Sequence, residues 1–293
     1  MKKVALCLHG YFNSLKDHSS LGLDGYEHIK KNILNYRTAG YQIDIFFHSW
    51  EPNLLEKICD LYDPVLWISE EQIDFNKVAK EHCVSREDLD LHQKLGSWSL
   101  TSRKGAGYVG PERILSHFYS VQKSVQLCKD WEKKNNFKYD CIIKSRFDLG
   151  RINRKYTGPN QKNPPVQCIN FNPELDMDFF YQAYWDLFNE GPADMWFYSS
   201  SENMKHFCSL YDRTLKEYLK KGSDYSTAVV QGWVESRINN FRSNESLKEV
   251  KNRSTELHKY PEHMVCNAIL LYKWFLIDSG LWQRSKPLKT RWE

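Results

Sequence analysis

The sequence has no clustered cysteines, no long apolar run and no strong excess of one charge. Its eight cysteines are spread along 293 residues without a C-x-x-C pair, which argues against a zinc site or a disulfide framework and favours reduced thiols in a cytoplasmic protein. The longest apolar run, residues 268–277, contains Lys273 and is far shorter than the roughly 20 residues of a membrane-spanning helix. A net charge of +4, with acids and bases interspersed, does not indicate a nucleic-acid partner.

Two well-defined catalytic motifs are also missing. The stretch VALCLHGYFNS, residues 4–14, ends an apolar run in His-Gly as α/β-hydrolases do, but the chain has no G-x-S-x-G nucleophile elbow. The phosphate loop G-x-x-x-x-G-K-[ST] of kinase-like enzymes is absent as well. Gly105, Gly107 and Gly110 spell G-x-G-x-x-G, but no buried strand precedes them. We interpret residues 103–110 as a loop at a helix N-terminus, which could hold phosphate or simply face solvent.

Short apolar runs alternate with helical patterns through the first half of the chain. The runs 4–8, 41–50 and 141–143 are typical of strands, and the stretches 26–36 and 53–62 of helices. A long helix is predicted from Pro111, with a buried stripe formed by Ile114, Phe118, Val121, Val125 and Cys128 and with Ser116, Tyr119, Ser120 and Lys123 facing the other way. Further strands are expected at 166–171 and after Asp194, followed by helices. This alternation predicts an α/β fold whose mostly parallel central sheet is flanked by helices.

Polar residues gather where the predicted strands end. In YDCIIKSRFDLGR, Arg146 and Asp148 follow a buried strand, at the carboxyl edge where open α/β sheets bind ligands. The carboxylate could hold a metal or a ribose hydroxyl while the guanidinium meets phosphate, or the two could form a buried ion pair. Asp194, in GPADMWFYSS, could act as general base for a sugar hydroxyl or bond to its own turn. His48 ends another strand, where a lone histidine is more often a hydrogen-bonded rim residue than a ligand.

Taken together and in this order, CLHGYFNS, DIFFHSW, ERILSHFYSVQKSV, YDCIIKSRFDL and ADMWFYSS resemble a family of GT-A-like glycosyltransferases. Members occur in bacterial surface-polysaccharide clusters and in large viruses that glycosylate their own capsids. The similarity covers roughly residues 1–215. It implies a GT-A-like, Rossmann-like fold with a helical C-terminal region, in which residues 1–152 bind the donor and residues 153–293 bind the acceptor within one compact unit.

The resemblance also implies a reaction: transfer of a sugar from a nucleotide-diphosphate sugar to a hydroxyl of a glycan or glycoprotein acceptor, in the cytoplasm, or in the host cytoplasm if the protein is viral. Asp194 would be the catalytic base, and inversion is expected if it faces the acceptor hydroxyl opposite the leaving diphosphate. Around the nucleotide sugar the resemblance places His9, Gly10, Tyr11, Asn13, His48, Trp50, Ser120, Lys123, Arg146 and Asp148.

A metal cofactor is left open at this stage. Asp148 stands where the family keeps the metal-binding end of an Asp-x-Asp motif, but position 146 is arginine. Manganese or magnesium could bind Asp148, or Arg146 or Lys123 could neutralise the diphosphate instead. The alternative function is a non-catalytic carbohydrate-binding or assembly protein, suggested by an aromatic content of 14%.

Overall fold

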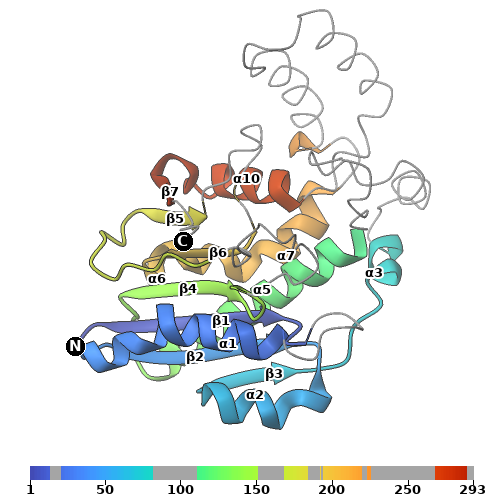
Figure 1. The fold of residues 1–293 in the computed structure, drawn as a ribbon. Coiled ribbons are helices and arrows are strands. Elements are labelled where there is room, and N and C mark those ends of the chain that lie inside the picture. The colour runs from blue at the N-terminus through green and yellow to red at the C-terminus, as the bar shows by residue number, and fades with distance from the viewer. Residues whose placement is uncertain are drawn as a thin grey trace, which may run out of the picture.

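The computed structural model describes residues 1–13, 21–81, 111–150, 168–183, 192, 194–219, 223–225 and 268–288 (Figure 1). Its seven strands are β1 (Lys3–Gly10), β2 (Gln42–Ser49), β3 (Leu66–Ser69), β4 (Cys141–Arg146), β5 (Phe180–Ala183), β6 (Trp196–Ser199) and β7 (Ser285–Leu288). The α-helices are α1 (Leu21–Asn32), α2 (Leu55–Tyr62), α3 (Phe75–Glu81), α5 (Pro111–Lys134), α6 (Ser201–Met204), α7 (Leu210–Arg213) and α10 (Ala268–Asp278). Short 3-10 or π turns are η1 (Leu34–Ala39), η2 (Pro52–Leu54), η4 (Lys205–Ser209), η5 (Thr214–Tyr218) and η7 (Trp282–Arg284).

All seven strands belong to one sheet in the order β3-β2-β1-β4-β6-β5-β7. Strands β1 to β4 are mutually parallel, β6 runs against its neighbours, and β5 and β7 return to the direction of β4. The order 3-2-1-4 of the first half is that of a mononucleotide-binding unit, which places its ligand crevice at the carboxyl ends of these strands. The predicted α/β fold with a mostly parallel sheet is confirmed.

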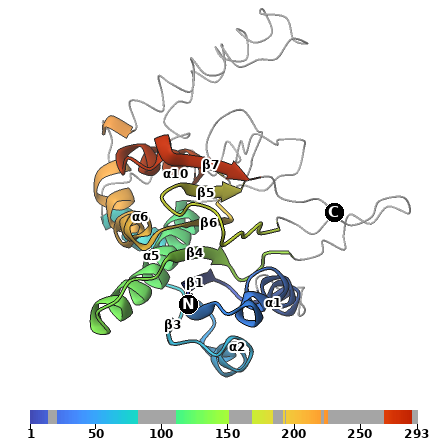
Figure 2. The same cartoon turned by 90° about the vertical axis from the view of Figure 1, so that its left-hand side faces the viewer.

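Helices cover both faces of the sheet, so the molecule has three layers (Figures 1 and 2). Side chains of β1 alternate between the two faces: Ala5 and Cys7 belong to the core on the α5 side, whereas Val4, Leu6 and Leu8 belong to the core on the α1 side. This period of two is the consequence of strand geometry. The central strands are buried on both sides, and most of their polar residues lie towards the strand ends; Asp44 in β2 and Lys144 in β4 are exceptions.

The long helix begins at Pro111, as predicted, and its stripe of apolar residues is buried against the sheet. Two residues of the opposite stripe, which faces away from the first as predicted, are buried as well. Ser116 and Ser120 are buried, because α5 is covered on that side by the ends of the strands and by α3 and α7. A helix packed between a sheet and other helices buries more than one face.

Two strand predictions need correction. Residues 168–171 pair with no strand of the sheet; the carbonyls of Cys168 and Asn170 instead accept hydrogen bonds from Trp196 and Tyr198. The C-terminal region is helical in α10 but also supplies β7, which closes one edge of the sheet beside β5. The short β3 is a further strand that the apolar pattern did not indicate.

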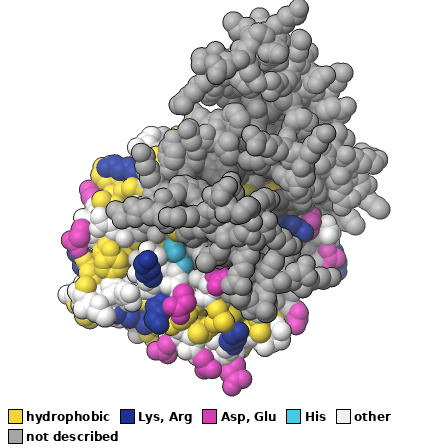
Figure 3. Space-filling model, in the orientation of Figure 1, with side chains coloured by type: hydrophobic (Ala, Val, Ile, Leu, Met, Phe, Trp, Pro, Cys, Tyr) yellow, Lys and Arg dark blue, Asp and Glu magenta, His cyan; other side chains and the backbone are white. Residues whose placement is uncertain are grey.

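The distribution of charged side chains on the surface and the state of the cysteines match what the sequence predicts. On the face shown in Figure 3, acidic and basic side chains of the described residues are interspersed. Six cysteines of these residues are free thiols, mostly buried or partly buried. Within the described ranges, no helix is long and apolar enough to cross a membrane. The predicted loops at 103–110 and 153–165 lie outside the described residues, and the division into donor and acceptor halves stays a prediction.

Candidate functional site

The candidate site lies at one edge of the sheet, where β1, β2, β3 and β4 end and β6 begins. The antiparallel register sets Trp196, the first residue of β6, beside Ser145 near the end of β4. Asp194 therefore arrives at the edge to which the parallel strands deliver His9, His48 and Arg146. In the register His9 lies between His48 on β2 and Arg146 on β4. Four of the predicted residues are thus brought together by topology alone.

One group of side chains, which we call the basic cluster, consists of His9, His117, Lys144, Arg146 and Asp194. His9 is 1% exposed, and neither of its ring nitrogens has a hydrogen-bond partner among the described residues. Its ring lies edge-on to that of His117, with centroids 4.9 Å apart. His117 Nε2 is 2.8 Å from the hydroxyl of Tyr272 on α10 and 3.9 Å from Asp194 Oδ2. A buried imidazole without hydrogen-bond partners lowers the stability of the fold.

Lys144 lies beneath the exposed members of the basic cluster. It is fully buried in β4, and its ammonium donates a hydrogen bond to the backbone carbonyl of Asp194. The ammonium also lies 4.7 Å from the ring centroid of Phe197 and 5.2 Å from that of Tyr272. Aromatic faces stabilise such a cation where water is excluded. Lys144 thereby fixes the turn that carries Asp194 and adds positive charge under it.

Arg146 and Asp148 form a two-point ion pair. Arg146 Nε is 2.7 Å from Asp148 Oδ1, and its Nη2 is 2.6 Å from Oδ2. The third guanidinium nitrogen faces the sulfur of Met195 at 3.7 Å. Asp148 is buried, whereas the side chain of Arg146 is 30% exposed. The ion-pair interpretation of SRFDL therefore describes this geometry, with Arg146 still reaching the surface.

The charges of the basic cluster follow from burial and from one another. Burial lowers the pKa of Lys144 to about 7 and that of His117 to about 3, and it also lowers the pKa of His9 well below its usual value. Burial alone would raise the pKa of Asp194, but His117, Arg146 and Lys144 outweigh it and lower that pKa. Asp194 is therefore ionised at neutral pH, with 27% of its side chain exposed.

A second group, which we call the bracing cluster, consists of Gly10, His48, Glu70 and Ser120. The Gly10 backbone N–H donates to Ser120 Oγ at 2.9 Å, and this hydroxyl lies 2.7 Å from His48 Nδ1. His48 Nε2 in turn lies 3.0 Å from Glu70 Oε1. Burial lowers the pKa of His48, although Glu70 opposes this shift. These contacts tie the end of β1 to β2, to the segment after β3 and to α5.

Aromatic rings surround the bracing cluster. Trp50 is buried and stacks on Tyr119 with centroids 5.4 Å apart, and the ammonium of Lys123 lies 5.1 Å from the same tyrosine ring. Trp50 also lies edge-on to His48. The structure thus groups the predicted residues His48, Trp50, Ser120 and Lys123 on this side of the edge.

The loop after β1 is held by side chains of the protein itself. The backbone N–H groups of Phe12 and Asn13 both donate to the carboxylate of Glu51, the latter at 2.9 Å. The hydroxyl of Tyr11 donates to Gln72 Oε1 at 2.7 Å. These amides face Glu51 rather than the edge of the sheet, so the nucleotide-binding role predicted for Tyr11 and Asn13 stays a prediction.

Several residues of the site were not among those predicted from the sequence. Lys144 has no role in the sequence-based prediction, although its position in a buried apolar run, two residues before Arg146 and on the same face, is a signal for one. His117 lies one helical turn before Ser120, which is a weaker signal. Glu70 and Tyr272 are brought in by β3 and α10, and no local pattern indicates them.

Comparisons with known proteins find a similar solved structure and no matching family. No family model and no curated protein matches the chain. Among solved structures it is similar to the crystal structure of a glycosyltransferase involved in the glycosylation of the major capsid of PBCV-1, with 9% identity and a TM-score of 0.29. The alignment covers 87% of this chain and 100% of that chain. A likeness at this level carries no argument about activity, so the function is argued from the geometry of the edge.

Proposed function

We propose that the chain is a glycosyltransferase that moves a sugar from a nucleotide-diphosphate sugar to a hydroxyl of a glycan acceptor. The observation that carries the proposal is the placement of Asp194. An ionised, partly exposed carboxylate stands at the carboxyl edge of the parallel strands, within a group of basic side chains that includes an unpartnered buried imidazole. This edge is where α/β sheets of this order bind nucleotides.

Asp194 acts as the general base in this proposal. Its carboxylate accepts the proton of the acceptor hydroxyl while the hydroxyl oxygen forms a bond to the anomeric carbon. The bond from that carbon to the diphosphate oxygen breaks, and the electron pair leaves with the nucleoside diphosphate. Attack from the side of Asp194, opposite the leaving group, inverts the anomeric centre. The hydrogen bond from Lys144 to the Asp194 carbonyl holds the base in place.

The remaining basic residues stabilise the leaving diphosphate. Arg146 and His117 are the partly exposed members of the basic cluster, and they can donate hydrogen bonds to phosphate oxygens. His9 lies behind them, and its ring nitrogens have no hydrogen-bond partner among the described residues. A neutral imidazole donates one hydrogen bond without adding charge. Preorganised donors of this kind stabilise charge that develops in the transition state.

The residues around Asp148 do not suit a divalent metal. Both carboxylate oxygens accept hydrogen bonds from Arg146, so the cation of the protein itself already occupies this carboxylate. Within the described ranges, no group of three or more His, Cys, Asp or Glu side chains could hold a metal ion. Manganese and magnesium prefer several oxygen ligands. We therefore assign the neutralisation of the diphosphate to Arg146, with the buried Lys144 beneath it, and assign no role to a metal ion.

The test combines binding and turnover. Thermal unfolding is measured with UDP, GDP and CMP and their sugar conjugates, with and without Mn²⁺, because a ligand that binds only the folded state raises Tm. Release of the nucleoside diphosphate is then followed for the wild type and for Asp194→Asn. The proposal expects stabilisation by one nucleotide family in both proteins and turnover in the wild type alone. Absence of stabilisation by every nucleotide would overturn it in favour of a carbohydrate-binding protein without catalysis.

A further inference from the structure

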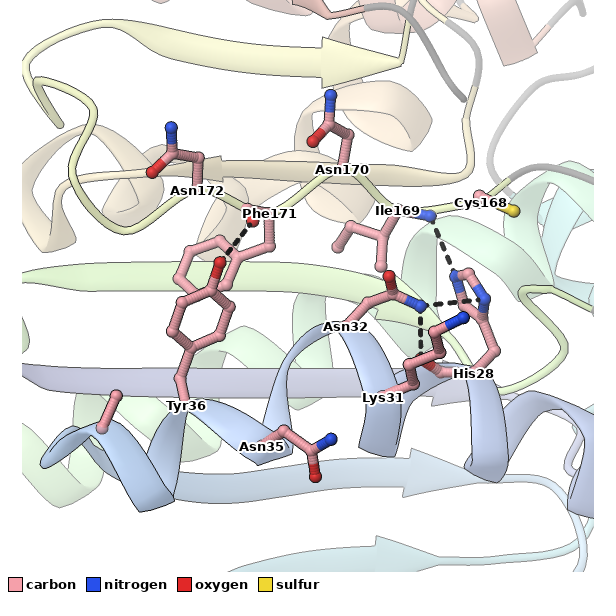
Figure 4. Close-up of a pocket in the computed structure, with 11 residues that line it drawn as sticks. His28, Lys31, Asn32, Asn35, Tyr36, Cys168, Ile169, Asn170, Phe171 and Asn172 are labelled. Carbon is pink, nitrogen blue, oxygen red and sulfur yellow. Dashed lines mark hydrogen bonds between the residues drawn. The ribbon is translucent and has the colours of Figure 1, made fainter. Parts of the chain in front are cut away.

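We propose that a groove on the α1 side of the sheet binds a neutral oligosaccharide. The groove has a volume of about 770 Å³ and lies between α1 with η1 on one side and the extended segment 168–172 on the other (Figure 4). This volume falls within the roughly 300–1,000 Å³ of small-ligand sites. The residues of the basic cluster do not line it, so it is a separate site from the edge where transfer is proposed.

The two walls of the groove are joined by hydrogen bonds. The backbone N–H of Ile169 donates to His28 Nε2 at 3.1 Å, and the hydroxyl of Tyr36 donates to the carbonyl of Phe171 at 3.4 Å (Figure 4). The amide of Asn32 is fixed by a 2.8 Å hydrogen bond to the carbonyl of His28. Ile169 and Phe171 anchor the extended segment by burying their side chains in the core. The lining is therefore held in place before any ligand binds, which lowers the entropic cost of binding.

The chemistry of the lining selects the class of ligand. Four asparagines belong to the lining, Asn32 and Asn35 on one wall and Asn170 and Asn172 on the other. The amide nitrogen of Asn32 and the amide oxygen of Asn172 are bonded within the protein, and the amides of Asn170 and Asn172 point away from α1 in the view of Figure 4. The exposed amide of Asn35 therefore has the most to offer a ligand. An amide offers both a donor and an acceptor, which suits hydroxyl groups that also do both. Tyr36 adds a partly exposed ring, the kind of apolar surface on which a sugar ring can pack.

Other ligand classes fit the lining less well. Lys31 is the only lining residue among those described that is charged at neutral pH, because burial and Lys31 lower the pKa of His28 to about 4. None of the described lining residues carries a carboxylate, so they offer a metal ion no anionic ligand. A single exposed lysine is a weak site for a diphosphate, and the many amides disfavour an apolar ligand. A polyhydroxylated, uncharged ligand remains.

The groove begins next to the turn that carries Asp148. A Cβ on Gly150 would lie 2.1 Å from His28 Cγ, and a Cβ on Gly25 would lie 1.9 Å from the carbonyl oxygen of Phe147. Glycine at both positions lets α1 pack directly on the turn 147–150. An oligosaccharide in the groove would therefore lie along α1 with one end near this turn. The inference that this oligosaccharide is the acceptor rests on the proposed function. The inference that the groove binds an oligosaccharide does not.

The experiment measures binding of the full chain to a printed array of neutral and acidic oligosaccharides without nucleotide. The wild type is compared with Asn35→Ala in the groove, with Lys31→Glu, and with Asn76→Ala as a matched exposed asparagine on α3. We expect binding to neutral oligosaccharides that Asn35→Ala weakens by about five- to tenfold, the effect of one hydrogen bond. Asn76→Ala leaves it unchanged, and Lys31→Glu changes it by less than about twofold.

Three results would overturn the assignment. No binding to any member of the array excludes an oligosaccharide site, and binding that Asn35→Ala leaves intact places the ligand elsewhere. Binding to acidic members alone, lost in Lys31→Glu, shows an anionic ligand instead. Nucleotide stabilisation is measured on the same samples. If no nucleotide stabilises the protein but the array binds, the proposed sugar transfer is contradicted and the groove assignment stands. If nucleotides stabilise the protein but the array does not bind, the groove assignment is contradicted and the proposed transfer stands.

Discussion

The basic cluster and the bracing cluster share one edge of the sheet but use buried polar groups in opposite ways. In the bracing cluster, the Gly10 amide, the Ser120 hydroxyl, the His48 ring and the Glu70 carboxylate form an unbroken chain of hydrogen bonds. In the basic cluster, His9 has no hydrogen-bond partner among the described residues and lies among other basic groups. Completed networks rigidify a structure, whereas buried groups without partners lower its stability unless a ligand binds. We therefore propose that the bracing cluster supports the fold and that the basic cluster binds the ligand.

The largest effect is expected from Asp194→Asn in the basic cluster. Asparagine keeps the shape of the side chain and the backbone carbonyl that Lys144 contacts, but it cannot accept a proton. General-base catalysis contributes about 10²–10⁴-fold, so nucleoside diphosphate release should fall by about 10³-fold. Stabilisation by the nucleotide should persist. Full turnover in Asp194→Asn would show that another group is the base.

A second test removes one cation from each side of the edge. Arg146→Met leaves the buried Asp148 carboxylate without its guanidinium, and the free energy of unfolding should fall by about 3 kcal/mol. Affinity for a nucleoside diphosphate should fall at least about tenfold. Lys123→Met, beside the bracing cluster, loses a contact with the ring of Tyr119 and a longer-range attraction to Asp212, and should cost less than about 1 kcal/mol. Urea unfolding and calorimetric titration measure both quantities.

The outcome also locates the diphosphate. Equal losses of affinity in Arg146→Met and Lys123→Met would place it over both clusters rather than over the basic cluster alone. A loss confined to Lys123→Met would reverse the assignment.

A third test compares the free energies of unfolding of one variant in each cluster. Ser120→Ala deprives both the buried Gly10 amide and His48 Nδ1 of a partner and should lower the free energy of unfolding by about 1–3 kcal/mol. His9→Leu removes a buried imidazole that has no partner among the described residues, and its stability should stay within about 1 kcal/mol of the wild type. Chemical unfolding of both variants measures the contrast. Equal losses would remove the distinction between the clusters.

The smallest expected effect is on the pH dependence of stability. The pKa of His117 is about 3 in the folded protein, because burial outweighs the attraction of Asp194, and about 6.5 in an unfolded chain. The unfolded chain therefore binds more protons below pH 6.5, and stability falls as the pH drops from 6.5 towards 3. Between pH 6.5 and 5.5 this amounts to at most about 1 kcal/mol for one histidine. Unfolding of His117→Gln across this range should show a shallower slope, and an unchanged slope would contradict the assignment.

Local patterns predicted the fold and much of the edge. Pro111 after Gly110 marks the start of α5, and the spacing of its apolar residues matches the stripe buried in the core. Polar residues after buried strands, such as His48 and Arg146, could be placed at one edge because parallel strands end on the same side. The extended segment 168–171 has strand-like alternation without a place in the sheet, since side-chain donors rather than a neighbouring strand satisfy its carbonyls.

The sequence by itself determined the alternation of strands and helices, the burial of their apolar faces and the polar character of the strand ends. These follow from periods of two and 3.6 residues, which act over short stretches of chain. Only the tertiary structure decided that Asp148 meets Arg146, that Lys144 lies under Asp194, and that Glu70 and Tyr272 join the edge from distant segments. Such pairings depend on register, on strand order and on which helix packs where. Contacts between segments far apart in the chain set these features, and no local pattern contains them.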